Sequence, residues 1–223
     1  MMPGFVITPC IPSSAARSLS YRTAAVDETD TNSYSFASQD FGTADANRHL
    51  IIAITGEAVS GSIAISSVTI GGVSATITVQ ASSDDATKGV AGIAIAAVPS
   101  GATGTVAVTF NANARYAGIA VWAAYNLASA TAVDTASSTS GTADPTSLNV
   151  DTAINDFVIA VGRSDNASSA AWTGVTKRFD LTYGGTDEHT GGDHTATTAE
   201  TPRTVQYNMS SAGRACGVAA VFR

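Results

Sequence analysis

The chain has 223 residues, a formal net charge of −7 at pH 7 and only 13% charged residues. This length is enough for one domain, or at most two small ones, with a sizeable core. The apolar fraction of 44% excludes a disordered chain, and the absence of heptads rich in leucine, lysine and glutamate excludes a coiled coil.

Positive charge is sparse and scattered along the chain. Lys88 and Lys177 are the only lysines, and the arginines form no cluster, so we expect no binding to nucleic acid or to an anionic membrane surface. The longest apolar run, Ala91–Val98, is far shorter than the roughly 20 residues that cross a bilayer. No basic residue precedes Arg17 and prolines interrupt the apolar N-terminus, so we expect no signal peptide.

Residues 1–26 differ from the rest of the chain. They hold Pro3, Pro9 and Pro12, which keep a chain extended, and they show no alternating pattern. We therefore predict an extended N-terminal arm that contacts a neighbouring subunit. Cys10 and Cys216 lie near opposite ends of the chain, and we interpret them as small, buried or half-buried thiols rather than as a disulfide framework.

From Ser33 onward, short apolar runs of period two alternate with Gly, Ser, Asn and Asp. This pattern is typical of strands and turns. It predicts an all-β domain over residues 27–223, a single antiparallel β-sandwich of jelly-roll type. The runs are Tyr34–Phe36, Leu50–Ile54, Ile63–Ile65, Val68–Ile70, Ala75–Val79, Ile93–Ile95, Val106–Phe110, Tyr116–Tyr125, Leu148–Val150, Phe157–Val161, Val175–Phe179, Leu181–Tyr183, Thr204–Tyr207 and Cys216–Phe222.

Two details of this pattern allow more than one interpretation of the fold. The Ala-rich stretch Gly118–Ala132 has helix propensity, but Ile119, Val121 and Thr131 favour a strand. Leu50–Ile54 and Phe157–Val161 each open a strand–loop–strand stretch, a similarity too weak to indicate a duplication.

The most polar candidate site lies between Asp187 and His194. Asp187, His189, Asp193 and His194 fall within eight residues and could bind Ca²⁺ through carboxylates or Zn²⁺ through imidazoles. The spacing matches no structural zinc pattern and no EF-hand loop. A polar hairpin loop without metal is the favoured interpretation. The acidic loops Asp27–Asn32 and Ser82–Asp85 are interpreted in the same way.

Aromatic residues form a second candidate site. Trp122, Tyr125 and Tyr207 belong to the set, but Trp122 lies mid-strand among Ala and Val and is expected in the core. Trp172 and Tyr183 are the candidates for contact with a glycan, because aromatic faces suit sugar C–H groups. Burial remains the favoured interpretation for each tryptophan.

No pattern of a catalytic nucleophile, phosphate loop or dinucleotide fingerprint is present. A glycosidase needs two carboxylates across a cleft. Asp151, Asp156 and Asp180 are available for that role, and nothing in the sequence singles them out.

Four stretches resemble β-sandwich structural proteins of tailed bacteriophages and gene transfer agents: Ile65–Thr76, Ser100–Phe110, Ala171–Asp180 and Arg214–Phe222. The resemblance covers most of residues 33–223 and lies in the texture of the strands rather than in an invariant motif. It implies a β-sandwich with a non-enzymatic role as a capsid decoration, head spike or fibre, or minor tail protein. It carries over no catalytic residue and no cofactor.

The composition agrees with this resemblance. A Thr- and Ser-rich, Lys-poor β domain is typical of exposed surfaces, and a virion protein assembled in the cytoplasm needs no signal peptide. We therefore expect a homo-oligomeric virion protein that contacts other virion proteins through the arm. Distal loops at Asp187–His194 and Asn166–Trp172 would contact a host surface glycan. The alternatives are a carbohydrate-binding or adhesive module and a jelly-roll enzyme that degrades glycans.

Overall fold

All the regular secondary structure in the described residues is β-strand, which confirms the predicted all-β class. The computed structural model describes residues 15–83, 88–140, 146–165, 169–208 and 214–223. The strands are β1 (Ser18–Asp27), β2 (Thr31–Asp40), β3 (Arg48–Ala58), β4 (Ile65–Ile70), β5 (Val73–Ser74), β6 (Thr76–Ser82), β7 (Gly89–Ala97), β8 (Thr103–Tyr125), β9 (Asp134–Ser140), β10 (Thr146–Thr152), β11 (Phe157–Ser164), β12 (Ala171–Thr173), β13 (Thr176–Tyr183), β14 (Asp187–Thr195), β15 (Glu200–Asn208) and β16 (Ala215–Phe222).

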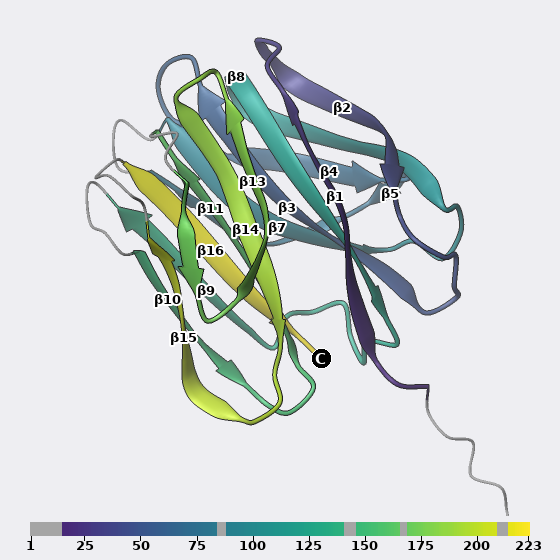
Figure 1. Cartoon of the computed structure of the whole chain (residues 1–223). Helices are drawn as coiled ribbons and strands as arrows, with labels where there is room; N and C mark the ends of the chain where they lie inside the picture. The colour runs from purple at the N-terminus through teal and green to yellow at the C-terminus, as the bar shows by residue number, and fades with distance from the viewer. Residues whose placement is uncertain (1–14, 84–87, 141–145, 166–168, 209–213) are drawn as a thin grey trace, which may run out of the picture.

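Strands β1 to β8 form a first sandwich. They belong to one eight-stranded sheet, which β8 folds into two layers because its 23 residues run through both (Figure 1). The first part of β8 pairs with β2 and β4, and its last part pairs with β1 and β3. A core of large side chains, among them Phe36, Phe110, Leu50 and Ile52, fills the space between the layers.

Strands β9 to β16 form a second sandwich. Its five-stranded sheet has the order β13-β14-β11-β16-β9, and its three-stranded sheet has the order β10-β15-β12. The core between them is smaller and consists mainly of Val and Ala, with Leu148, Val150, Val158, Val205 and Val221 as its largest aliphatic members.

The two sandwiches have the same strand connectivity. The neighbours β6-β7-β3-β8-β1 correspond to β13-β14-β11-β16-β9, and β2-β8-β4 corresponds to β10-β15-β12. The long β8 therefore takes the places of both β15 and β16. Leu50–Ile54 and Phe157–Val161 fall on the central strands β3 and β11. The similarity between these two segments is too weak to indicate a duplication by itself, but they occupy equivalent places in two jelly-roll-like repeats. The sequence predicted a single sandwich.

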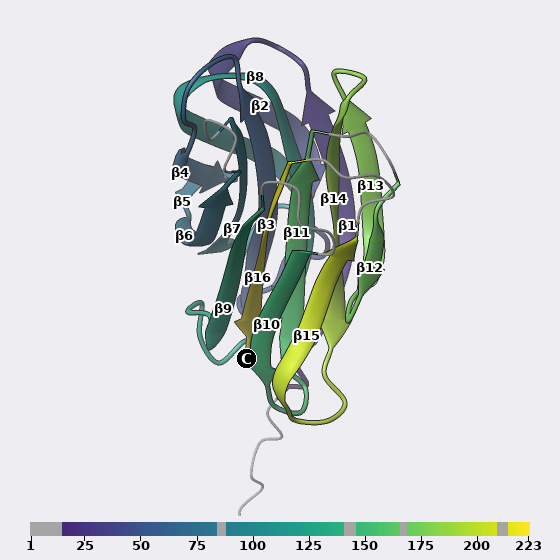
Figure 2. The same ribbon diagram turned by 90° about the vertical axis from the view of Figure 1, so that its left-hand side faces the viewer.

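The two five-stranded layers pack face to face. Side chains from β3, β7 and β8 meet side chains from β11 and β16 in a shared apolar core that includes Ile51, Ile93, Trp122, Ile159 and Val218. β1 lies near β13, and β6 lies near β9 (Figure 2). The middle of β3, Leu50–Ile54, is apolar on both faces because one face enters the first sandwich and the other enters this shared core.

The predicted N-terminal arm is shorter than residues 1–26 at its C-terminal end. Ser18–Asp27 form β1, which pairs with the last part of β8 from Ser18↔Tyr125 to Asp27↔Ala117. The apolar Leu19 and Tyr21 pack against the shared core, which explains why this segment joins the sheet. Residues 1–14, with the three prolines and Cys10, lie outside the described residues.

Candidate functional site

Polar side chains gather in two places, and both involve β14. The first place, called here the interface cluster, lies between the two sandwiches and consists of Thr55, Glu57, Arg163, Tyr183, Asp187 and His189. The second, called here the carboxyl cluster, lies inside the second sandwich and includes Asp180 and Glu188. Because successive side chains of a strand point to opposite faces, β14 supplies alternate residues to each cluster.

Arg163 is the centre of the interface cluster and is 0% exposed. Its Nη2 lies 2.9 Å from Glu57 Oε2 of the first sandwich, and it also donates to Asp187 Oδ1 of the second. Burial and a hydrogen bond with Asp187 together raise the pKa of Glu57 to about 7, against the opposing charge of Arg163. A protonated Glu57 beside Asp187 would leave one cation and one anion in the cluster.

His189 occupies the other side of the interface cluster. Its Nδ1 lies 2.8 Å from Thr55 Oγ1, which also accepts a hydrogen bond from Tyr183 Oη at 3.3 Å. Burial lowers the pKa of His189 to about 3, so the imidazole is neutral at physiological pH. The ring of Phe179 lies against it at 4.5 Å between centroids.

The four candidate metal ligands on β14 do not converge. Asp187 bonds to Arg163, His189 to Thr55, and Asp193 to Trp122 and Arg178. His194 follows Asp193 and by alternation lies on the opposite face of the strand. No group of three or more potential ligands occurs within the described parts of the chain. The predicted hairpin loop is instead the strand β14, paired with β11 on one side and β13 on the other.

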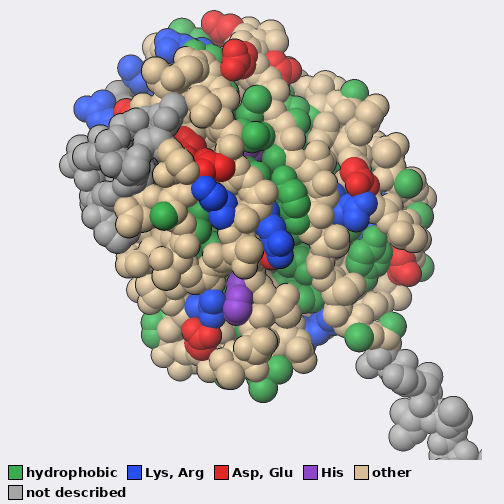
Figure 3. Space-filling view, in the orientation of Figure 1, with side chains coloured by type: hydrophobic (Ala, Val, Ile, Leu, Met, Phe, Trp, Pro, Cys, Tyr) green, Lys and Arg blue, Asp and Glu red, His purple; other side chains and the backbone are tan. Residues whose placement is uncertain are grey.

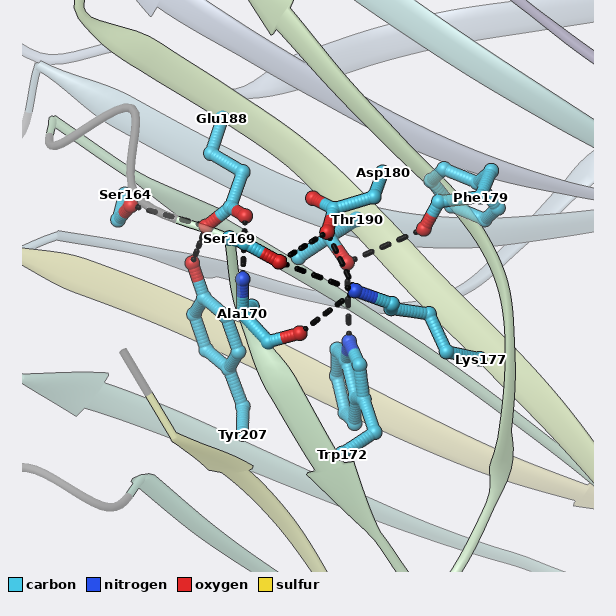
Figure 4. Close-up of polar contacts among 10 residues, drawn as sticks. All are labelled: Ser164, Ser169, Ala170, Trp172, Lys177, Phe179, Asp180, Glu188, Thr190 and Tyr207. Atoms are coloured by element: carbon cyan, nitrogen blue, oxygen red, sulfur yellow. Dashed lines mark hydrogen bonds and ion pairs between the residues drawn. The ribbon is translucent and has the colours of Figure 1, made fainter. Parts of the chain in front are cut away.

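Glu188 is the buried member of the carboxyl cluster, at 1% exposure. It accepts hydrogen bonds from the backbone N–H of Ala170 at 2.8 Å, from Tyr207 Oη at 3.0 Å and from Ser164 Oγ at 3.4 Å (Figure 4). Burial, the hydrogen bond with Asp180 and the charge of that carboxylate together raise the pKa of Glu188 to about 8.

Asp180 is the ionised partner in this cluster. Burial alone would raise its pKa, but hydrogen bonds from Glu188 and Lys177 and the charge of Lys177 together lower it. Lys177 Nζ lies 2.5 Å from Asp180 Oδ2 and also donates to the carbonyl of Ala170 at 2.9 Å. One carboxyl that keeps its proton therefore lies beside one carboxylate that loses it.

Trp172 covers the carboxyl cluster from β12. It stacks on Tyr207 with the ring centroids 5.1 Å apart, and its Nε1 donates to Thr190 Oγ1 at 3.0 Å (Figure 4). Trp172 is half-buried. Tyr183, the other residue predicted to contact a glycan, is 0% exposed and belongs to the interface cluster. That prediction is wrong for Tyr183, because both sandwiches cover it. Trp122 is buried as expected.

The three aspartates available for glycan hydrolysis have different surroundings. Asp151 is an exposed residue of β10, whereas Asp156 is buried and accepts hydrogen bonds from Arg223 Nε at 2.9 Å and Nη2 at 2.8 Å. Asp180 lies in the carboxyl cluster. Its partner with the shifted pKa is Glu188, which is not among the candidates predicted from the sequence. The pKa of Asp180 is lowered and that of Glu188 is raised, as in an acid–base pair. The oxygens of Glu188, however, already accept hydrogen bonds from other groups of the protein.

The remaining loops contain ordinary turns. Asp27–Asn32 joins β1 to β2, with Asp27 Oδ1 accepting from the N–H of Thr29 and Glu28 Oε1 accepting from the N–H of Gly184. Ser82 and Ser83 are described, whereas residues 84–87 lie outside the described residues, as do residues 166–168 of the predicted Asn166–Trp172 tip. Cys216 is buried, as expected.

Comparisons with known proteins give no match for this chain: no family model, no curated protein and no solved structure is similar to it. Within the described residues, no helix is long and apolar enough to cross a membrane.

Proposed function

We propose that this chain is a non-enzymatic structural protein of a tailed phage or a phage-like particle, exposed on the head or the tail. The observation that carries the proposal is the tandem of two jelly-roll-like sandwiches packed through a shared apolar core. Jelly-roll sandwiches are a recurrent architecture of viral capsid proteins. A protein whose layers are locked together in this way suits a rigid building block.

The stretches that resemble phage proteins support the proposal by their positions. Ile65–Thr76 covers β4 to the start of β6 of the first sandwich, and Ala171–Asp180 covers β12 and most of β13 of the second. These are corresponding places in the two repeats. Two of the four stretches therefore fall at equivalent places of the repeated fold.

The polar clusters also favour a structural role. The carboxyl oxygens of Glu188 and Asp193 accept hydrogen bonds from groups of the protein itself, and Arg163 joins the two sandwiches. On the face drawn in Figure 3, charged side chains are scattered over a surface made mostly of uncharged groups. Such a surface suits contacts between protein subunits that do not depend on ion pairs.

The test is to purify particles from cells that encode this chain and to identify their proteins by mass spectrometry. We expect the chain at a fixed ratio to the major capsid protein through successive density gradients. Its loss from intact particles during purification would overturn the proposal. Hydrolysis of a polysaccharide by the purified protein, abolished by Asp180→Asn, would support the glycan-degrading enzyme instead.

A further inference from the structure

β9 (Asp134–Ser140) is an uninterrupted strand at the end of a sheet. It pairs with β16 from Asp134↔Val221 to Ser140↔Ala215 without a register shift, and it ends the order of the five-stranded sheet. Thr135, Ser137 and Thr139 are exposed. An edge strand presents a row of backbone N–H and C=O groups to which another strand can pair.

The other strands at sheet edges in the described structure carry features that hinder such pairing. β5 and β12 have two and three residues. Register shifts interrupt β1, β2, β6, β10 and β13. Charged side chains add to this protection on β1, β10 and β13, which carry Arg22, Asp151 and Lys177. Short edges, bulges and edge charges are the means by which proteins prevent unwanted association. β9 has none of them beyond Asp134 at its start.

The pocket between β9 and β6 has an uncharged lining. A pocket of about 250 Å³ is lined by Thr76, Ile77 and Thr78 of β6, by residues 130–132 and by Thr135. In a protein with a net charge of −7, two copies that meet at this surface would bring no like charges together.

We propose that β9 is the edge through which two copies of this chain associate, by antiparallel pairing of β9 with β9 about a twofold axis at Ser137. The axis at Ser137 sets Thr135 opposite Thr139 and Ala136 opposite Ser138 of the other copy. Thr135–Thr139 reads almost the same in both directions, so the facing side chains are similar. Cross-strand Thr pairs stabilise a sheet. The paired edge would join two five-stranded sheets into one, a self-complementary contact of the kind common in dimers.

The inference rests on the proposed function in one respect only: both expect copies of the chain to associate. Its first test is sedimentation velocity at micromolar concentration. The wild-type chain should be a dimer, and Ser137→Lys should weaken the dimer about tenfold or more, because two lysines would face each other at the axis. Ser35→Lys, at an exposed serine of β2, is the matched control and should leave the dimer intact. A monomeric wild type, or a Ser137→Lys chain that dimerises like the wild type, would overturn the inference.

A second test reads the register in a Cys10→Ser background. Ser137→Cys should form a disulfide-linked dimer under mild oxidation, because the two introduced thiols would face each other at the axis. Thr135→Cys alone should stay unlinked, since the two copies of residue 135 would lie about 13 Å apart along the strands. A mixture of Thr135→Cys and Thr139→Cys chains should link. Equal linking of all single variants would contradict the register.

Particles that contain the chain but show no β9 pairing would refute this inference alone, and a β9 dimer absent from particles would refute the proposed function alone.

Discussion

The indole N–H of Trp122 donates a hydrogen bond to Asp193 Oδ2 at 2.7 Å, across the boundary between the two sandwiches. Arg178 donates to both oxygens of the same carboxylate, from Nε at 2.8 Å and from Nη2 at 2.9 Å. Asp193 therefore holds an aromatic residue of the first sandwich and a cation of the second at once. The relative position of the two repeats therefore depends on these three side chains.

Trp122→Phe should lower the free energy of unfolding by about 1.5–3 kcal/mol, because it removes a hydrogen bond to a buried charged group. Urea denaturation at neutral pH measures the change. Trp172→Phe is the matched control, since its indole is half-buried and donates to the neutral hydroxyl of Thr190. We expect a smaller loss there, about 0.5–1.5 kcal/mol. Equal losses in the two variants would show that the contact with Asp193 adds nothing specific.

The strands of this fold could be predicted where burial is apolar. Leu50–Ile54 and Phe157–Val161 are central strands because both faces of each are buried, and such runs are visible in sequence. β14 could not be predicted in this way. Its buried side chains are Asp, Glu, His and Thr, whose burial depends on partners such as Arg163 and Trp122 that are distant in the chain.

The duplication could not be predicted from the sequence either, for a related reason. Strand connectivity is repeated, but the two cores contain different side chains. Phe110 and Phe36 fill the first sandwich, whereas Val205 and Val221 fill the second. A sandwich core tolerates such exchanges of volume if the pattern of apolar and polar residues is kept. The repeat therefore survives in the pairing of strands and not in the identity of residues.

Gly118→Ala should destabilise the boundary between the sandwiches. A Cβ on Gly118 would lie 2.7 Å from His189 Cγ and 3.0 Å from Thr55 Oγ1, so the buried imidazole would have to shift. We expect a loss of about 1–3 kcal/mol, typical of overpacking. Gly217→Ala is the control, because a Cβ there would meet its nearest atom at 3.5 Å, an ordinary contact. Thermal unfolding followed by circular dichroism compares the two, and the prediction is wrong if Gly118→Ala melts no lower than Gly217→Ala.

The stability of the protein should fall as the pH rises from about 4.5 to about 8, in part through Glu188. Its pKa in the folded chain is about 8, above the ordinary value of 4.5, so the folded state favours the protonated form. The stability from this group is therefore full below pH 4.5 and is lost as the pH rises through 8. The slope from one such group is at most about 1.4 kcal/mol per pH unit.

Glu188→Gln should flatten this dependence, because the amide does not ionise. Unfolding free energies measured at intervals from about pH 5 to about pH 9 give the slope across the range in which this stability is lost. Glu28→Gln, at an exposed glutamate, is the control and should leave the slope as in the wild type. An unchanged slope in Glu188→Gln would show that this carboxyl loses its proton with no effect on folding.

The two charged partners in the interface cluster should respond very differently to mutation. Arg163→Met leaves Asp187 as a buried anion without its guanidinium, a change that costs about 3–5 kcal/mol in buried ion pairs. Glu57→Gln at pH 6 replaces a carboxyl that is mostly protonated, because burial raises its pKa to about 7. We expect a change within about 1 kcal/mol there, since an amide also donates a hydrogen bond to Asp187. As the pH rises past 7, the wild type loses stability through Glu57 and the Gln variant does not, so the difference should move in favour of the variant. Urea denaturation of both variants at pH 6 and of Glu57→Gln at pH 9 measures these changes. If Glu57→Gln were as damaging as Arg163→Met at pH 6, Glu57 would have to be ionised in the folded protein and Arg163 would be balancing two anions rather than one.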